Sequence, residues 1–229
     1  MDSTRRTATI VGALFLVAMV ASLVGGALVD GVFAAPDYLA RAAGSPATLT
    51  TGVALELVNA LAVLLIATAL FPVFKRQGEG AALGYVGFRL LEAVTLAAAA
   101  FIPVTLVSLG RASTGADAAA LSSFEVLGNQ LLRMRAGLLG ILVPLFFCLG
   151  AVLLYNWLLR SKLLPRFIPI WGLVGVVGIA ALNLLNVGTT VAMVLALPII
   201  LNEVFLGVWL MVKGFDGVAA TPRAAAPAA

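Results

Sequence analysis

Histidine is absent from this sequence, and cysteine occurs once, as Cys148 in the apolar run LFFCLGAVLL. Histidine is the commonest general base near neutral pH and a usual ligand of zinc and haem iron. A lone cysteine cannot form an intramolecular disulfide, and inside an apolar run it packs as a small apolar residue. The HExxH, GxSxG and Walker motifs are also missing from the sequence. We therefore predict no cofactor and no metal site, and an enzymatic activity is disfavoured but left open.

Charged residues are scarce as well. They make up 10% of the 229 residues, whereas hydrophobic residues make up 62%. Soluble domains have about 45–50% apolar and about 25% charged residues. An excess of this size cannot be buried in a soluble core, so the expected partner is a lipid bilayer. The net charge of +4 does not indicate a nucleic-acid partner, because the basic residues gather at the ends of apolar runs.

Six apolar runs are long enough for a helix to cross the hydrocarbon core, which takes about 20 residues. They cover residues 8–29, 51–73, 81–109, 132–159, 167–187 and 190–212. The first run follows Arg5 and Arg6, as in a signal peptide, but it exceeds the usual apolar region of about 7–15 residues. We predict a membrane span there, with cleavage near the FAAP of residues 33–36 as the alternative.

The distribution of Lys and Arg predicts the orientation, because basic residues concentrate in cytoplasmic loops. They gather before the first run, in FKRQGEG after the second, in RSKLLPR after the fourth and beyond the sixth. The opposite loops carry Arg41 and Arg111 beside acidic residues, and Arg133 and Arg135 near the outer end of the fourth run are exceptions. Six spans with both termini in the cytoplasm satisfy this bias.

Two outer loops are long enough to carry structure. We expect a short interfacial helix in PDYLARAAGSPATL, with Tyr38 at the headgroup level, and an amphipathic helix in TGADAAALSSFEVLGNQLL leading into the fourth span. The predicted fold class is therefore all-α, a polytopic bundle of six transmembrane helices with short interfacial helices in the outer loops. Residues 1–215 are expected to form a single domain, and residues 216–229 a disordered cytoplasmic tail.

A few ionisable residues lie inside the apolar runs: Glu56, Arg89, Glu92, Arg133, Arg135 and Glu203. Each charge near the bilayer centre costs about 2.5–3.5 kcal/mol, so such side chains face the bundle interior and find partners. At a rise of about 1.5 Å per residue, Arg89 and Glu203 reach similar depths, and Glu56 and Arg135 both lie in the outer third. We predict two layers, Arg89 with Glu203, and Arg135 with either Glu92 or Glu56.

Uncharged polar residues share helix faces with these charges. Tyr85, Arg89 and Glu92 follow the spacing i, i+4, i+7, which places them on one face. The candidate site, a ligand-binding site or a buried polar network, comprises Arg89, Glu92, Glu203, Glu56, Arg135, Tyr85, Asn59 and Asn202. Two interpretations are equally favoured: a paired network that fixes helix register, or a cavity in which one charge meets a ligand, an ion or a proton.

Proline and tryptophan mark further positions in the runs. Pro144 and Pro198 lie well inside two runs, and each should kink its helix and leave a backbone carbonyl open to another partner. Pro103 lies near a helix end, where it costs little. Trp157 lies toward the cytoplasmic end of its run and is interpreted as an interface anchor.

The chain resembles the bacterial integral-membrane family called domain of unknown function 4386. The resemblance rests on three stretches: GYVGFRLLEA, FCLGAVLLYNWLLRSKLLPRFIPIWGLVG and ALPIILNEVFLGVWLMVKGF. It implies a multi-helix protein of the bacterial inner membrane and implies no activity or site residues.

Three functions are compatible with these observations. The first, which the sequence favours, is a transporter or binding protein for a small molecule or an ion, with Arg89, Glu92 and Glu203 lining its site. The second is a non-catalytic structural or accessory protein whose buried ion pairs only fix helix packing. The third is an intramembrane enzyme that acts on a lipid through carboxylates. A homo-oligomer is compatible with all three.

Overall fold

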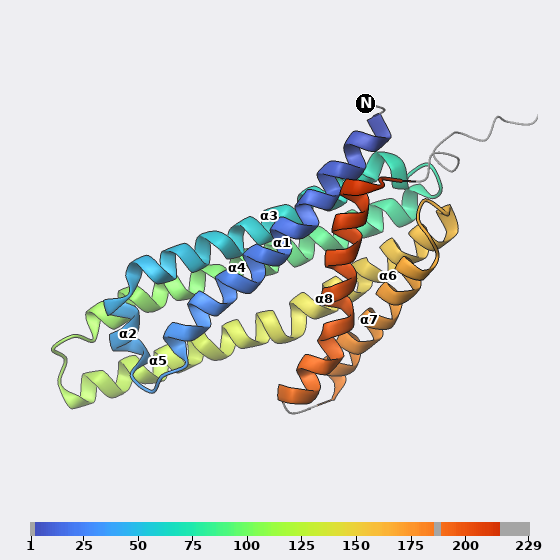
Figure 1. The fold of residues 1–229 in the computed structure, drawn as a ribbon. Helices are drawn as coiled ribbons and strands as arrows, with labels where there is room; N and C mark the ends of the chain where they lie inside the picture. The colour runs from blue at the N-terminus through green and yellow to red at the C-terminus, as the bar shows by residue number, and fades with distance from the viewer. Residues whose placement is uncertain (1–2, 186–188, 216–229) are drawn as a thin grey trace, which may run out of the picture. The chain divides into compact units, whose positions relative to one another are not determined.

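The computed structural model describes residues 3–185 and 189–215, so the predicted tail of residues 216–229 lies outside the described residues. The described residues form helices and no strands (Figure 1). The elements are α1 (Ser3–Phe33), α2 (Tyr38–Gly44), α3 (Pro46–Phe74), α4 (Glu79–Ala112), α5 (Ala118–Gly137), the π-helical η1 (Leu138–Leu142), α6 (Val143–Ser161), α7 (Phe167–Leu184) and α8 (Thr189–Val212).

Six of the helices in the described part of the chain are long and apolar enough to cross a membrane. The fourth is continuous from Ala118 to Ser161, because α5, η1 and α6 follow one another without a break. The amphipathic segment expected to lead into the fourth span is therefore the first part of that helix. The predicted all-α fold with six spans is confirmed, and the chain is a multi-pass membrane protein.

The chain divides into two compact units. Unit 1 comprises Met1–Leu16, Ile66–Val86 and Cys148–Ala229, and unit 2 comprises Val17–Leu65 and Gly87–Phe147. Each unit is thus assembled from segments that are distant in the sequence. The single domain expected over residues 1–215 stays a prediction.

In unit 2, the short helix α2 is packed within the protein. The Tyr38 ring is 7% exposed, and its hydroxyl donates a hydrogen bond of 3.2 Å to the backbone carbonyl of Glu125 in α5. Burial, followed by the nearby Glu125 carboxylate, raises the pKa of Tyr38 above its ordinary value and keeps the hydroxyl protonated as a donor. A Cβ on Gly128 would lie 2.5 Å from the Tyr38 hydroxyl oxygen, so only glycine allows this approach. Tyr38 therefore joins α2 to α5 through a partly buried hydrogen bond.

In unit 1, the first helix meets the end of the last. Arg5 Nη2 donates hydrogen bonds of 3.1 Å to the carbonyl of Met211 and 2.8 Å to that of Val212, near the C-terminus of α8. The last carbonyls of an α-helix have no donor within the helix, and a cation is favourable at this end of the helix dipole. Closer to the helix middles, a Cβ on Gly12 would lie 2.5 Å from the Gly207 carbonyl oxygen, so the two backbones are in contact.

The π-helical segment η1 changes which residues of unit 2 share a face. Val143 and Phe147 follow Arg135 by eight and twelve residues, which in a regular α-helix means rotations of about 80° and about 120°. A π turn takes up one extra residue and reduces both offsets to about 20°. Val143 accordingly packs on Ala60, Ala93 and Leu96, while the Phe147 ring lies 5.1 Å from the Arg89 guanidinium carbon.

Deleting one residue tests this interpretation of η1. Removal of Gly140, an exposed residue of η1, should convert the segment to α-helix and leave Arg135 and Phe147 in phase, at little cost in stability. Removal of Gln130, which is exposed in α5, should rotate Arg135 by about 100° relative to Gly128 and cost about 3–5 kcal/mol of unfolding free energy, because it separates a buried ion pair. Denaturation of the two purified variants in one detergent measures the difference. Equal losses would contradict the interpretation.

Candidate functional site

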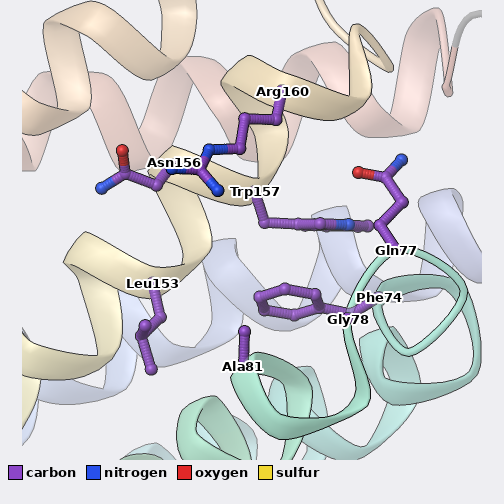
Figure 2. A pocket seen from close by; sticks show the side chains of 8 residues that line it. All are labelled: Phe74, Gln77, Gly78, Ala81, Leu153, Asn156, Trp157 and Arg160. Atoms are coloured by element: carbon purple, nitrogen blue, oxygen red, sulfur yellow. The ribbon is translucent and has the colours of Figure 1, made fainter.

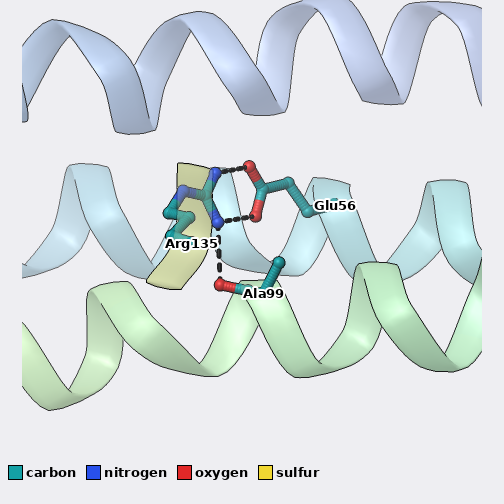
Figure 3. Close-up of polar contacts among 3 residues, drawn as sticks. All are labelled: Glu56, Ala99 and Arg135. Atoms are coloured by element: carbon teal, nitrogen blue, oxygen red, sulfur yellow. Dashed lines mark hydrogen bonds and ion pairs between the residues drawn. The ribbon is translucent and has the colours of Figure 1, made fainter. Parts of the chain in front are cut away.

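The first candidate site is a buried ion pair that contacts three helices of unit 2 (Figure 3). Arg135 of α5 binds both carboxylate oxygens of Glu56 in α3, Nη2 with Oε1, and Nη1 with Oε2 at 3.1 Å. Nη1 also donates a hydrogen bond of 2.8 Å to the backbone carbonyl of Ala99 in α4. We refer to Arg135, Glu56 and Ala99 as the three-helix contact. The structure thus pairs Arg135 with Glu56, one of the two partners that the sequence offered.

The Ala99 carbonyl is available because of a proline. Pro103 lies inside α4, four residues after Ala99, and has no N–H to donate back along the helix. Arg135 supplies the missing donor from another helix. Pro103 was expected to cost little because it lies near a helix end, whereas the structure shows a compensating hydrogen bond. The proline spacing is the sequence signal that identifies Ala99.

The second ion pair of unit 2 lies within a single helix. Arg89 Nη1 is 2.9 Å from Glu92 Oε2, and both residues are 4% exposed. The Arg89 guanidinium also lies over the Phe147 ring, at a distance that allows a cation–π interaction. The predicted buried Arg–Glu ion pairs are therefore confirmed. The pairing of Arg89 with Glu203 stays a prediction, since Glu203 belongs to unit 1.

The remaining candidate residues lie in both units. Asn59 is buried three residues after Glu56 in unit 2, whereas Tyr85, Asn202 and Glu203 belong to unit 1. The Tyr85 side chain is fully buried, with its ring centroid 5.9 Å from that of Phe74. Glu203 is half-buried in α8.

Asn202 joins three helices of unit 1. Its Oδ1 accepts a hydrogen bond of 2.7 Å from the Tyr155 hydroxyl in α6, and its Nδ2 donates one of 2.9 Å to the Ile168 carbonyl in α7. A Cβ on Gly172 would overlap the Tyr155 ring, so glycine at this position makes room for the tyrosine. Neither Tyr155 nor Ile168 was expected from the sequence, because an asparagine alone does not reveal its partners.

A pocket of about 320 Å³ lies in unit 1, and we refer to it as the Trp157 pocket (Figure 2). Its aromatic side is formed by Phe74 and Trp157, whose ring centroids are 4.5 Å apart at an interplanar angle of 23°. Polar side chains of Gln77, Asn156 and Arg160 line it as well. None of the eight predicted site residues contributes to this pocket, which joins the end of α3 and the start of α4 to the last turns of α6.

Trp157 differs from its predicted role as an interface anchor. Its side chain is 4% exposed, and its ring packs face to face with Phe74. The indole Nε1–H is buried and has no hydrogen-bond acceptor among residues 3–185 and 189–215. An unsatisfied buried donor of this kind calls for an explanation, because its desolvation costs about 1–3 kcal/mol. Among the same residues, no group of three or more acidic or cysteine side chains is placed to hold a metal ion.

Comparison with known families identifies the chain. A family model described as "Domain of unknown function (DUF4386)" matches residues 10–214. The chain therefore belongs to this family, as its sequence stretches indicated. Comparisons with curated proteins and with solved structures found no match.

Breaking the three-helix contact on one side should destabilise the protein strongly. Glu56→Gln leaves the Arg135 charge buried without its counter-charge, so we expect a loss of about 3–5 kcal/mol in unfolding free energy. Replacing both partners, Glu56→Leu with Arg135→Met, should recover most of that loss, because no buried charge remains. Denaturation in detergent measures both, with Glu125→Gln at an exposed position as the control. A double variant no more stable than Glu56→Gln would contradict the explanation.

Pro103 should couple to the three-helix contact. In the Glu56→Leu, Arg135→Met variant the Ala99 carbonyl loses its donor, and adding Pro103→Ala restores an N–H four residues along the helix. We expect Pro103→Ala to stabilise this variant by about 1–3 kcal/mol more than it stabilises the wild type. Pro72→Ala, a change at another proline inside a helix, should have the same effect in both backgrounds. Equal effects of Pro103→Ala in the two backgrounds would separate Pro103 from Arg135.

Proposed function

We propose that this chain is a non-catalytic structural or accessory protein of the bacterial cytoplasmic membrane, in which buried ion pairs fix the register of the helices. The observation that carries this proposal is the three-helix contact. Arg135 donates three hydrogen bonds to acceptors of its own chain, two to the Glu56 carboxylate and one to the Ala99 carbonyl. A bidentate arginine–carboxylate pair has a fixed geometry, so it holds α3, α4 and α5 at one relative rotation and depth.

The state of the carboxylates supports a structural role over transport or catalysis. A ligand anion that bound Arg135 would have to displace Glu56, which would then be a buried charge without a partner. Glu92 faces the same constraint, because it is 4% exposed and bound to Arg89. A carboxylate that acts as an acid or base must exchange its proton with a substrate. Glu56 and Glu92 are instead occupied by arginines, at positions where separating the pairs is costly.

The proposed orientation places both termini in the cytoplasm. Lys75 and Arg76 lie between α3 and α4, and Arg160, Lys162 and Arg166 lie at the junction of α6 and α7. The hydrogen bonds from Arg5 to the end of α8 support the same arrangement, because they bring the beginning of the first span to the end of the sixth. The positive-inside rule then assigns this basic side to the cytoplasm.

Reconstitution into liposomes tests the structural role against transport. Under imposed gradients of protons, sodium or potassium, proteoliposomes should lose each gradient no faster than protein-free liposomes, as followed with ion-sensitive dyes. The variant Glu56→Leu, Arg135→Met, Arg89→Met, Glu92→Leu should also insert and keep the wild-type helix content. A wild-type flux that Glu92→Gln abolishes and the exposed-site control Glu125→Gln preserves would overturn the proposal in favour of transport.

A further inference from the structure

The Trp157 pocket lies where helices end. Phe74 is the last residue of α3 and Arg160 belongs to the last turn of α6. Gly78 precedes α4, and Ala81 lies in its first turn. Helices that cross a bilayer end at the level of the lipid headgroups, so the pocket is at that depth. Its rim is accessible, because Gln77, Ala81 and Arg160 are exposed.

The polar groups of the pocket are mainly donors. Arg160 makes no ion pair with a carboxylate of the described residues, and Trp157 Nε1–H has no acceptor there. Asn156 Nδ2 donates one N–H to the Val152 carbonyl at 2.8 Å, and the same amide group carries a second N–H. Gln77 carries a further amide. Figure 2 shows the Gln77 and Arg160 side chains on one side of the Trp157 ring and Phe74 on the other. Such a set suits an acceptor-rich anion.

The charges that border the pocket favour an anion too. Lys75 and Arg76 follow Phe74 directly, and Lys162 follows the end of α6, whereas the single carboxylate in these neighbouring segments is Glu79. Basic pockets between membrane helices on the cytoplasmic side are a known setting for phosphate headgroups. The pocket volume of about 320 Å³ lies at the small end of ligand sites and is of the size of a headgroup rather than of a whole lipid.

We propose that the Trp157 pocket binds a phosphate-bearing anion, with Arg160 pairing to the phosphate and Trp157 Nε1–H and the Gln77 amide donating to its oxygens. The phosphate of an anionic phospholipid and a free phosphate share this chemistry. The stacked Phe74 and Trp157 rings give the pocket an apolar floor. The inference goes beyond the structural role proposed above, because it concerns unit 1, whereas the ion pairs that carry the structural role lie in unit 2.

Thermal unfolding of the purified full chain in detergent tests the proposal. The added probes are phosphatidylglycerol, phosphatidylcholine and inorganic phosphate, each titrated separately. Phosphatidylglycerol or phosphate should raise the unfolding midpoint, and phosphatidylcholine should raise it less. In Arg160→Gln the concentration for half of the effect should rise about tenfold or more, since a charge-assisted hydrogen bond is lost. In Trp157→Phe, which keeps the ring packing, it should rise about threefold.

The matched control is Arg166→Gln, which removes one positive charge from an exposed position outside the pocket. It should leave the concentration dependence unchanged. Protection by phosphatidylglycerol alone assigns the site to a lipid headgroup, and equal protection by inorganic phosphate assigns it to a soluble anion. The proposal is wrong if neither phosphatidylglycerol nor inorganic phosphate protects more than phosphatidylcholine, or if Arg160→Gln has no effect. It is also wrong if Arg166→Gln weakens protection as much as Arg160→Gln, which would indicate a diffuse basic surface.

Discussion

The hydrocarbon core of a bilayer offers no water to a charged side chain, and this constraint explains the interior of unit 2. Arg135 can remain charged there because Glu56 and the Ala99 carbonyl together accept three of its hydrogen bonds. Pro103 leaves the Ala99 carbonyl without a donor from its own helix, and Arg135 provides that donor. The π turn η1 then places Phe147 on the same helix face, where it meets Arg89.

The two units use their polar residues differently. In unit 2, Arg89 and Arg135 are bound to carboxylates of the same chain inside the spans. Arg160 of unit 1 lies at the end of its span, where water and lipid headgroups can compensate its charge. It forms no ion pair with a carboxylate of the described residues. A cation can therefore be retained for an external anion at a helix end at far lower cost than in the middle of a span.

Much of the fold could be predicted from the sequence, because about 20 successive apolar residues have few alternatives to a membrane helix. The depths of the side chains in the bilayer leave Arg135 two candidate partners, Glu92 and Glu56. Depth alone does not show which helices are neighbours, so the sequence cannot choose between them. The bond to Ala99 could have been anticipated from Pro103. The Trp157 pocket could not, because glutamine and asparagine at helix ends are ordinary and tryptophan there usually faces the interface. Only the tertiary packing of Trp157 on Phe74 reveals a buried donor.

The hydrogen bonds of Arg5 to the end of α8 also bear on the order in which the two units fold during synthesis. They join residues 206 and 207 positions apart, and unit 1 draws on the beginning, the middle and the end of the chain. At a synthesis rate of about 5–20 residues per second, Arg5 precedes its acceptors by roughly 10–40 s. Unit 2 can close its ion pair once Arg135 has entered the bilayer. Unit 1 must wait for the last helix, so during biogenesis the N-terminal half of α1, which is made first, is among the last segments to reach its final packing.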